Sequence, residues 1–277
     1  EELPLDFDIM DLNHQEFEAI HSKGFLLKKN ILNETQIEKI KKLVKLELEG
    51  KDTTRGFYPM SFKTFFIKLA KLEIKKFFGG LYLMHIKKKM NLDKNASNFY
   101  NDYCKLKMVD GYHNAVTNED ILPWHTDRAF HGHDPNKLPL PNNIYLRFLF
   151  YLTSVGPKNG CTSYIPGSHK ITHAVRSLIF EKKIKQMPFR YPKELIVLIN
   201  YKDNYKKIAE KLGSEKLIED FLQKAKLADE SQKSHIYDFK AEAGDVLIFN
   251  DGGYHRGSSP SVTERVIFRY VYSNKQF

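Results

Sequence analysis

The sequence predicts a mainly β protein with flanking helices, arranged as a β-sandwich or jelly roll. Three runs of β-branched and aromatic residues, at 144–152, 246–249 and 265–272, have the composition of buried strands. Gly, Pro and Asn interrupt the chain between short strands in this half, whereas the N-terminal third has helical periodicity. Short strands that follow a helical region are typical of a sandwich or jelly roll covered by helices.

Two helices are predicted in the N-terminal third. Asn33 begins the first as an N-cap, with Gln36 at the capping-box position, and Gly50 ends its apolar periodicity. The second is predicted over 60–78 and ends at the two glycines that follow. Both apolar stripes are typical of helices that pack on a core, and an amphipathic helix lying on a membrane surface is the alternative.

The composition gives no reason to divide the chain, because it contains no repeat and no Gly/Ser-rich linker. We therefore expect a single domain over 1–277, with a region of helices and strands at 1–100. The β core is expected at 101–174 and 236–277. The Lys/Glu-rich stretch 175–235 has weak helical periodicity and is interpreted as a helical insertion or lid.

The composition also excludes several classes of protein. With 42% hydrophobic and 13% aromatic residues, the chain can bury a sizeable core and is not intrinsically disordered. No run approaches the ~18 apolar residues that a membrane span needs. Cys104 and Cys161 lack the spacing of a zinc or redox motif, and the acidic first residues do not have the pattern of a secretory signal. These features favour a reduced, cytoplasmic, enzyme-sized protein.

The net charge of +10 has two interpretations. The chain has 36 Lys and only eight Arg, and a surplus dominated by Lys is typical of compositional bias rather than of a binding surface. Proteins that recognise nucleic acids rely on Arg for bidentate contacts, so the scarcity of Arg disfavours a nucleic-acid partner. The positive net charge therefore slightly favours an anionic small molecule as the partner. The sequence gives no indication of the oligomeric state.

One group of residues indicates a metal site. His125 and Asp127 are two positions apart, a spacing that on a strand directs both side chains to the same face. His255 follows the predicted strand 246–249 and completes a two-His, one-carboxylate triad, which leaves coordination positions open for a co-substrate and dioxygen. Arg265 begins a β run shortly afterwards, and its guanidinium could hold a dicarboxylate by a bidentate pair.

This ordered set, with two further motifs, resembles the phytanoyl-CoA dioxygenase-like family of iron(II)/2-oxoglutarate oxygenases. The sequence NGCTSYIPGSHK at 159–170 is similar to the N-G-x(4)-I-P-G-S-H-K signature of that family. Segments 17–25 and 243–249 are similar to its helix-to-strand opening and to one of its late core strands. The resemblance spans about 15–272 apart from the insertion. It implies a double-stranded β-helix core (a cupin-like jelly roll), Fe(II), 2-oxoglutarate as co-substrate and O2.

The resemblance implies roles for individual residues. The iron would be held by His125, Asp127 and His255. The candidates for binding the co-substrate are Arg265, its alternative Arg269 on the same strand face, Ser258 and Lys107. The candidates for binding the substrate, which flank these motifs, are Trp124, Arg128, His131 and Arg147. The simpler alternatives are that Trp124 is a core aromatic residue and that the charged candidates are surface residues.

We expect the chain to hydroxylate an unactivated C–H bond of a small, anionic organic molecule, with release of succinate and CO2. Related oxygenases that halogenate replace the carboxylate ligand by a small residue, so Asp127 favours hydroxylation or desaturation. An oxidative demethylase acting on nucleic acid and a non-catalytic cupin-like binding module are the alternatives. The scarcity of Arg disfavours the first of these, and the presence of all three metal ligands disfavours the second.

Overall fold

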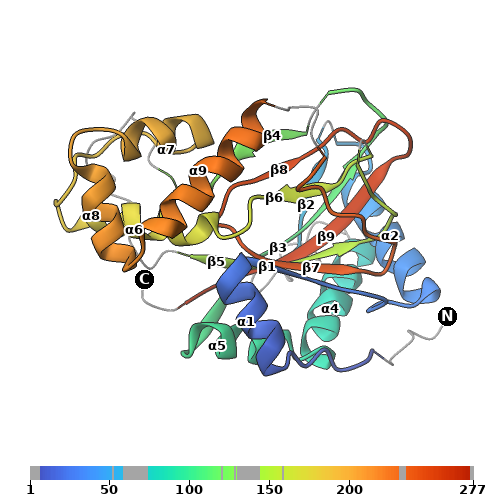
Figure 1. Ribbon diagram of the computed structural model, residues 1–277. Helices are drawn as coiled ribbons and strands as arrows, with labels where there is room; N and C mark the ends of the chain where they lie inside the picture. The colour runs from blue at the N-terminus through green and yellow to red at the C-terminus, as the bar shows by residue number, and fades with distance from the viewer. Residues whose placement is uncertain are drawn as a thin grey trace.

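The computed structural model describes residues 7–51, 53–58, 74–119, 121–127, 129, 144–157, 159–230 and 235–274. They form two antiparallel sheets, a group of N-terminal helices against the larger sheet and a second group of helices to one side (Figure 1). Helices hold more of the described residues than strands do. The predicted mainly β composition is therefore wrong, and the protein has a mixed helix and sheet fold.

The N-terminal region alternates helices with short strands. Its elements are α1 (His14–Lys23), β1 (Phe25–Lys28), α2 (Glu34–Leu48), β2 (Arg55–Phe57), α4 (Ile74–Lys89) and α5 (Leu92–Tyr100). The capping box predicted at Asn33 and Gln36 begins α2, which ends before Gly50 as predicted. Gly24 ends α1 with a φ of 93°, a left-handed conformation that favours glycine, and the chain turns there into β1.

The second predicted helix ends later than predicted. Residues 60–73 lie outside the described part of the chain, and α4 continues through Gly79 and Gly80 to Lys89. Glycine weakens a helix, but Gly79 has a packing role, because a Cβ there would lie 2.9 Å from Leu43 Cδ2 of α2. The glycine lets α2 and α4 approach closely instead of ending the helix.

The rest of the chain supplies most of the strands and the second group of helices. The strands are β3 (Cys104–Asn114), β4 (Leu122–His125), β5 (Tyr145–Tyr151), β6 (Thr162–Tyr164), β7 (Val246–Asn250), β8 (His255–Gly257) and β9 (Arg265–Asn274). The helices are α6 (Ser168–Phe180), α7 (Pro192–Ile199), α8 (Asn204–Leu212) and α9 (Glu215–Glu230). The three predicted strand runs correspond to β5, β7 and β9 and are confirmed.

The larger sheet has the order β1-β7-β5-β9-β3-β2, and every neighbouring pair is antiparallel. Side chains alternate between its two faces. On β5 and β9, residues such as Phe148 and Phe268 pack into the core shared with the N-terminal helices, whereas Leu149 and Ile267 pack on the other side. The alternation therefore directs odd-numbered residues of these two strands away from the helices.

The smaller sheet has the order β4-β8-β6. Tyr164 of β6 packs in one apolar cluster with Phe249 of β7 and Ile267 of β9, which joins the two sheets. The odd-numbered face of β5 and β9 therefore looks onto the smaller sheet.

The four helices α6–α9, here called the helical unit, have a core of their own. Val175, Leu195, Ile218 and Phe221, among others, are buried in it. The unit overlaps the stretch interpreted as an insertion or lid, but its first helix begins at Ser168, inside the motif at 159–170. The weak periodicity of the sequence underestimates this core, because each of four short helices contributes only a few apolar residues.

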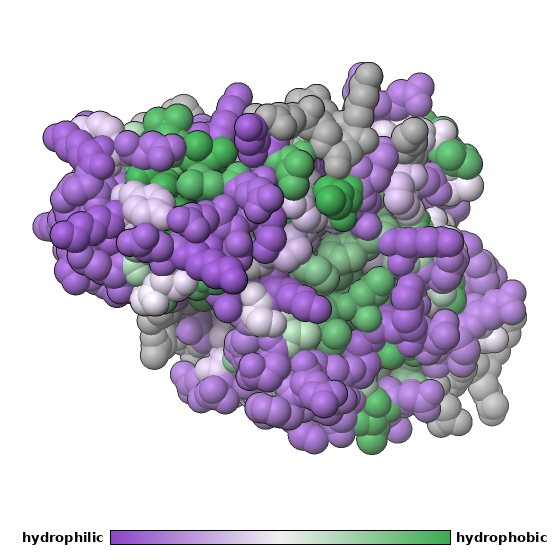
Figure 2. All heavy atoms as spheres, in the orientation of Figure 1, coloured by the Kyte–Doolittle hydropathy of each residue, from purple (hydrophilic) through white to green (hydrophobic). Residues whose placement is uncertain are grey.

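The face of the molecule drawn in Figure 2 is largely polar. Figure 2 shows one face covered mainly by hydrophilic side chains, with hydrophobic residues in smaller patches between them. Among the described residues, no helix combines the length and the apolar character needed to cross a membrane.

Candidate metal centre and arginine-lined cavity

His125, Asp127 and His255 come together in space, as the sequence predicts. One potential ligand atom from each of the three lies within 4.8 Å of the other two. The His125 Nε2 atom is 3.8 Å from Asp127 Oδ1, and the His255 Nε2 atom is 3.7 Å from Asp127 Oδ2. Within the described part of the chain, this is the group of His, Cys, Asp and Glu residues whose geometry suits a metal ion.

The smaller sheet positions the two imidazoles. His125 ends β4 and His255 begins β8, and the two residues are direct partners in the antiparallel register. Their rings lie 4.4 Å apart between centroids. Asp127 lies just beyond the end of β4 rather than on the strand, so the prediction that both residues of the H-x-D motif occupy one strand is wrong in this detail. A turn brings the carboxylate back towards the rings.

The helical unit holds the backbone around these ligands. The Thr126 amide donates to the Arg190 carbonyl at 2.9 Å, and the Arg176 guanidinium donates to the Asp127 carbonyl at 3.3 Å. Tyr254, next to His255, is buried in the core of the helical unit, and its hydroxyl donates to the Phe189 carbonyl. Both ligand segments are therefore anchored to the same group of helices.

Each imidazole is oriented by its second nitrogen. His125 Nδ1 lies 2.8 Å from the Pro123 carbonyl, and His255 Nδ1 lies 2.9 Å from the Gly253 carbonyl. A carbonyl can only accept, so Nδ1 donates in each ring, and Nε2 is the nitrogen that remains for a metal. Burial, with a smaller contribution from His125, lowers the pKa of His255 to about 3, which keeps its ring neutral.

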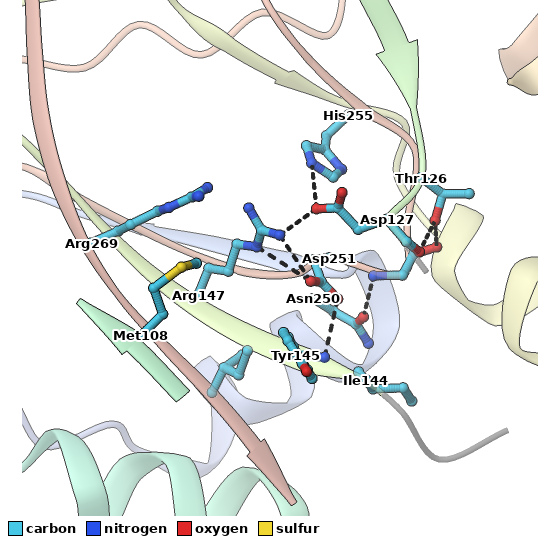
Figure 3. Close-up of polar contacts among 12 residues, drawn as sticks. Met108, Thr126, Asp127, Ile144, Tyr145, Arg147, Asn250, Asp251, His255 and Arg269 are labelled. Atoms are coloured by element: carbon cyan, nitrogen blue, oxygen red, sulfur yellow. Dashed lines mark hydrogen bonds and ion pairs between the residues drawn. The ribbon is translucent and has the colours of Figure 1, made fainter. Parts of the chain in front are cut away.

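The carboxylate is held by an arginine between two acids. Arg147 of β5 donates through Nη2 to Asp127 Oδ2, and through Nε and Nη2 to Asp251 Oδ2 at 3.3 and 3.1 Å (Figure 3). Burial alone would raise the pKa of Asp127, but the positive charge of Arg147 outweighs it and holds that pKa well below its ordinary range. Asp127 is therefore an anion at neutral pH, as a metal ligand must be.

A cavity of about 380 Å³ opens between the sheets at this triad. The three candidate ligands line it together with six of the eight arginines of the chain: Arg55, Arg147, Arg190, Arg256, Arg265 and Arg269. Strand alternation explains three of them, because Arg147, Arg265 and Arg269 are the odd-numbered residues of β5 and β9 that face the smaller sheet.

Arg265, the first residue of β9, is buried and lacks an acidic partner among the described residues. Its Nη2 lies 3.5 Å from Thr162 Oγ1, and its Nε has no hydrogen-bond partner. Burial lowers its pKa. Gly160 makes room for it: a Cβ at that position would lie 3.0 Å from Arg265 Cδ, and the φ of 68° is also one that favours glycine.

Arg269 is in a different state. Its Nε donates to Asp110 Oδ1 at 2.7 Å and its Nη2 to Asp110 Oδ2 at 3.0 Å, a bidentate pair, and Nη2 also donates to the Tyr112 hydroxyl at 2.8 Å. Asp110 is fully buried on β3. Arg269 thus has an acidic partner, whereas Arg265 has none among the described residues.

Three other predicted site residues, Ser258, Lys107 and Trp124, do not line this cavity. The Ser258 hydroxyl donates to the Cys161 carbonyl at 3.2 Å, and Lys107 lies at a register shift of β3. Trp124 points to the helical unit, lines a separate hollow with Tyr191 and receives the Arg256 guanidinium 5.2 Å above its ring. Arg128 and His131 lie outside the described residues.

Arg147 reaches the cavity, but its guanidinium is engaged by Asp127 and Asp251 rather than left open to a substrate. The sequence prediction missed Asp251, Asp110 and Arg55. Asp110 directly follows the apolar pair Met108 and Val109, and an acid at such a position was the available signal, since a buried carboxylate needs a partner.

The chain belongs to the phytanoyl-CoA dioxygenase (PhyH) family, which matches it over residues 20–266. No curated protein sequence matches the chain. The family and the site together indicate an enzyme of the non-haem iron, 2-oxoglutarate-dependent oxygenase type, and the cofactors of this type are Fe(II), 2-oxoglutarate and O2.

Several solved structures share the fold. HygX from Streptomyces hygroscopicus, solved with nickel and 2-oxoglutarate bound, is 14% identical with a TM-score of 0.56, over 96% of this chain and 89% of that one. The non-heme alpha ketoglutarate dependent carbocyclase SnoK from nogalamycin biosynthesis is 15% identical with a TM-score of 0.52, over 95% and 85%. The epimerase SnoN from the same biosynthesis is 12% identical with a TM-score of 0.51, over 94% and 82%.

The residues present fit such a metal. Two imidazole Nε2 atoms and one carboxylate form the two-His, one-carboxylate set that suits non-haem iron(II), and this set leaves part of the coordination sphere for other ligands. The unpartnered Nε of buried Arg265 provides, in the same cavity, a donor that a dicarboxylate would satisfy.

Proposed function

We propose that this chain is an iron(II)- and 2-oxoglutarate-dependent dioxygenase that hydroxylates an unactivated C–H bond of a small organic substrate, with release of succinate and CO2. The observation that carries the proposal is the presence, in one cavity, of the His125–Asp127–His255 triad and of Arg265 without an acidic partner. A metal site and a dicarboxylate site that share a cavity are what this reaction requires.

In this proposal the two Nε2 atoms and the Asp127 carboxylate hold the iron. Bound there, iron(II) supplies the activation of dioxygen and the oxidation of the substrate that accompanies decarboxylation of 2-oxoglutarate. The protein contributes positioning. The Pro123 and Gly253 carbonyls fix the two rings, and Arg147 holds Asp127 Oδ2, which leaves Oδ1 towards His125.

Arg265 anchors the distal carboxylate of 2-oxoglutarate, and Thr162 beside it provides a hydroxyl. Arg269 is the weaker candidate for this role because Asp110 already accepts two hydrogen bonds from it. Ser258 and Lys107 have no part in the proposed anchor. We also propose that the two sheets form a double-stranded β-helix, or jelly roll, within a single domain; the two strand orders support this. Arg190, which precedes α7, lines one side of the cavity.

The substrate is proposed to be a small molecule. The cavity of about 380 Å³ has room for one beside the co-substrate, and HygX, which shares the fold, has also been solved with hygromycin B bound. Trp124, Arg128 and His131 remain candidates for the walls of the substrate path. A different oxidative outcome is the second candidate, because the similar structures include a carbocyclase and an epimerase.

The proposal is tested with the purified chain, Fe(II) and 2-oxoglutarate. Without oxygen, we expect a visible charge-transfer absorption from the iron–2-oxoglutarate complex, and with oxygen, slow succinate release even without substrate. His125→Ala should reduce both to background because it removes a ligand. His113→Ala is the matched control, since His113 pairs with Glu264 outside the cavity.

Two results would contradict the proposal. One is the absence of any 2-oxoglutarate-dependent absorption or succinate from the intact chain with iron. The other is an equal signal from His125→Ala and from the intact chain. A product with a newly closed ring or an inverted stereocentre would leave the assignment as an oxygenase in place. It would replace hydroxylation by cyclisation or epimerisation as the reaction.

A further inference from the structure

We propose that Arg55, Arg269 and Tyr112 form an anion subsite that binds a carboxylate, sulfate or phosphate group of the substrate. The subsite lies on the larger sheet in the same cavity as the metal triad. The inference rests on the proposed function for the identity of the bound molecule, and it adds the chemical class of that substrate.

One buried carboxylate organises the subsite. Asp110 Oδ2 accepts from Arg55 Nε at 2.7 Å and from Arg269 Nη2 at 3.0 Å, while its Oδ1 accepts from Arg269 Nε at 2.7 Å. Arg269 and Asp110 are nine-tenths or more buried. Two guanidinium groups therefore share one negative charge, and the cluster carries a formal charge of +1 at the cavity wall.

The cluster has hydrogen-bond donors to spare. Among the described residues, the Nη1 groups of Arg55 and Arg269 have no acceptor, and neither belongs to the buried atoms without partners, so both remain accessible. The Tyr112 hydroxyl accepts from Arg269 and keeps its own proton to donate. Burial raises the pKa of Tyr112, so this proton stays in place at neutral pH.

A purely structural role does not account for this arrangement. One arginine would be enough to neutralise Asp110 and to tie β3 to β9. The second, Arg55, comes from β2, and its side chain is 33% exposed. It gives the cluster a net positive charge at the wall of the cavity, which attracts an anion. A bound ligand would explain why two guanidinium groups surround one carboxylate.

The subsite is separate from the proposed co-substrate anchor. Arg265 and Arg269 occupy the same face of β9 four residues apart, which corresponds to roughly 13 Å along a strand. Figure 3 shows Arg269 directed to the same side as Arg147 and the Asp127 carboxylate. One strand would thus present one guanidinium to 2-oxoglutarate and another to the substrate, with the metal triad facing both.

The test uses the chain loaded with Fe(II) and 2-oxoglutarate without oxygen, and sodium acetate and sodium sulfate as probes at constant ionic strength. Calorimetry should show saturable binding of at least one probe. Arg55→Gln should weaken it roughly tenfold or more, because a charge-assisted hydrogen bond is lost. Arg55→Lys should restore part of it. Lys42→Gln, which removes an exposed charge on α2, is the matched control and should bind as the intact chain does.

The same variants separate this inference from the proposed function. Arg55→Gln should keep the charge-transfer absorption with 2-oxoglutarate, since Arg55 is not part of that anchor. A second readout measures succinate release with small carboxylic acids and with their methyl esters as candidate substrates. Only the acids should stimulate the release, and they should stimulate it less in Arg55→Gln than in the intact chain.

Three results would overturn the subsite. The first is that neither probe binds saturably to a loaded chain that shows the charge-transfer absorption. The second is that Arg55→Gln binds the probes as tightly as the intact chain does. The third is that Arg55→Gln loses the charge-transfer absorption itself. The last would place Arg55 in the co-substrate site. Absence of the absorption from the intact chain would instead count against the proposed function.

Discussion

The two sheets contribute different chemistry to the one cavity between them. The smaller sheet brings His125 and His255 opposite each other on neighbouring strands, each with its Nδ1 beside a backbone carbonyl. The larger sheet brings charged groups, among them Arg147, Arg265 and Arg269, from strands that are far apart in the sequence.

This difference indicates a division of work. Metal ligation needs unprotonated nitrogen, which the carbonyl-capped rings of the smaller sheet provide. Binding of anionic molecules needs guanidinium groups in a place with little water, which the larger sheet provides. The larger sheet also gives its arginines different partners, so that one of them is left open while others are engaged.

The largest effect that tests this division is expected from replacing each of the two arginines of β9 in turn. Arg265→Gln should raise the KM for 2-oxoglutarate roughly 10- to 100-fold, because it removes the bidentate donor for a carboxylate. Arg269→Gln should change that KM little. Succinate release measured against 2-oxoglutarate concentration checks both. The reverse order of effects would make Arg269 the anchor and remove the distinction between the two residues.

A smaller effect is expected where the sheets meet, at the Asp127–Arg147–Asp251 chain of contacts. Asp251→Asn weakens the acceptor that fixes Arg147, and Arg147 in turn orients the carboxylate ligand. We expect iron affinity to fall roughly tenfold, as is usual when the partner of a metal ligand is changed. Anaerobic titration with Fe(II) measures this. Unchanged affinity in a variant with an unchanged melting temperature would mean that Arg147 does not orient the ligand.

The smallest effect concerns the two cysteines, one on each side of the larger sheet. Cys161 packs with the cluster between the sheets, and burial raises its pKa to about 12. Burial also raises the pKa of Cys104, in the core shared with the N-terminal helices. Both thiols should therefore stay protonated at pH 8 and resist iodoacetamide in the folded chain, with Cys161 the slower. Mass spectrometry before and after unfolding in guanidinium checks this, and rapid labelling of folded Cys161 would contradict it.

The contrast between the metal ligands of the smaller sheet and the arginines of the larger sheet explains what the sequence could predict. The metal ligands were within reach because His125 and Asp127 are neighbours in the chain and His255 follows a recognisable strand. Strands β5, β7 and β9 were equally clear, because central strands are buried on both faces and contain mostly β-branched, aromatic and other apolar residues.

The electrostatic pairing was out of reach of the sequence. Whether Arg265 or Arg269 is open depends on Asp110, which lies about 155 positions earlier and meets β9 only through the register of β3. In the same way, the sequence predicts that Arg147 binds the substrate, but in the structure its guanidinium pairs with two carboxylates. The continuation of α4 through Gly79 depends on Leu43 of another helix, which no local rule contains.

The anchoring of both ligand segments to the helical unit has a thermodynamic consequence. Tyr254 lies in the core of that unit beside His255, and the backbone of Thr126 is bonded to that of Arg190. Opening of the helical unit would therefore pull the iron ligands apart. By linkage, whatever occupies the metal site adds its binding free energy to the stability of four helices that do not touch it. Local unfolding of α6–α9, read by amide hydrogen exchange, thus becomes a reporter of metal occupancy.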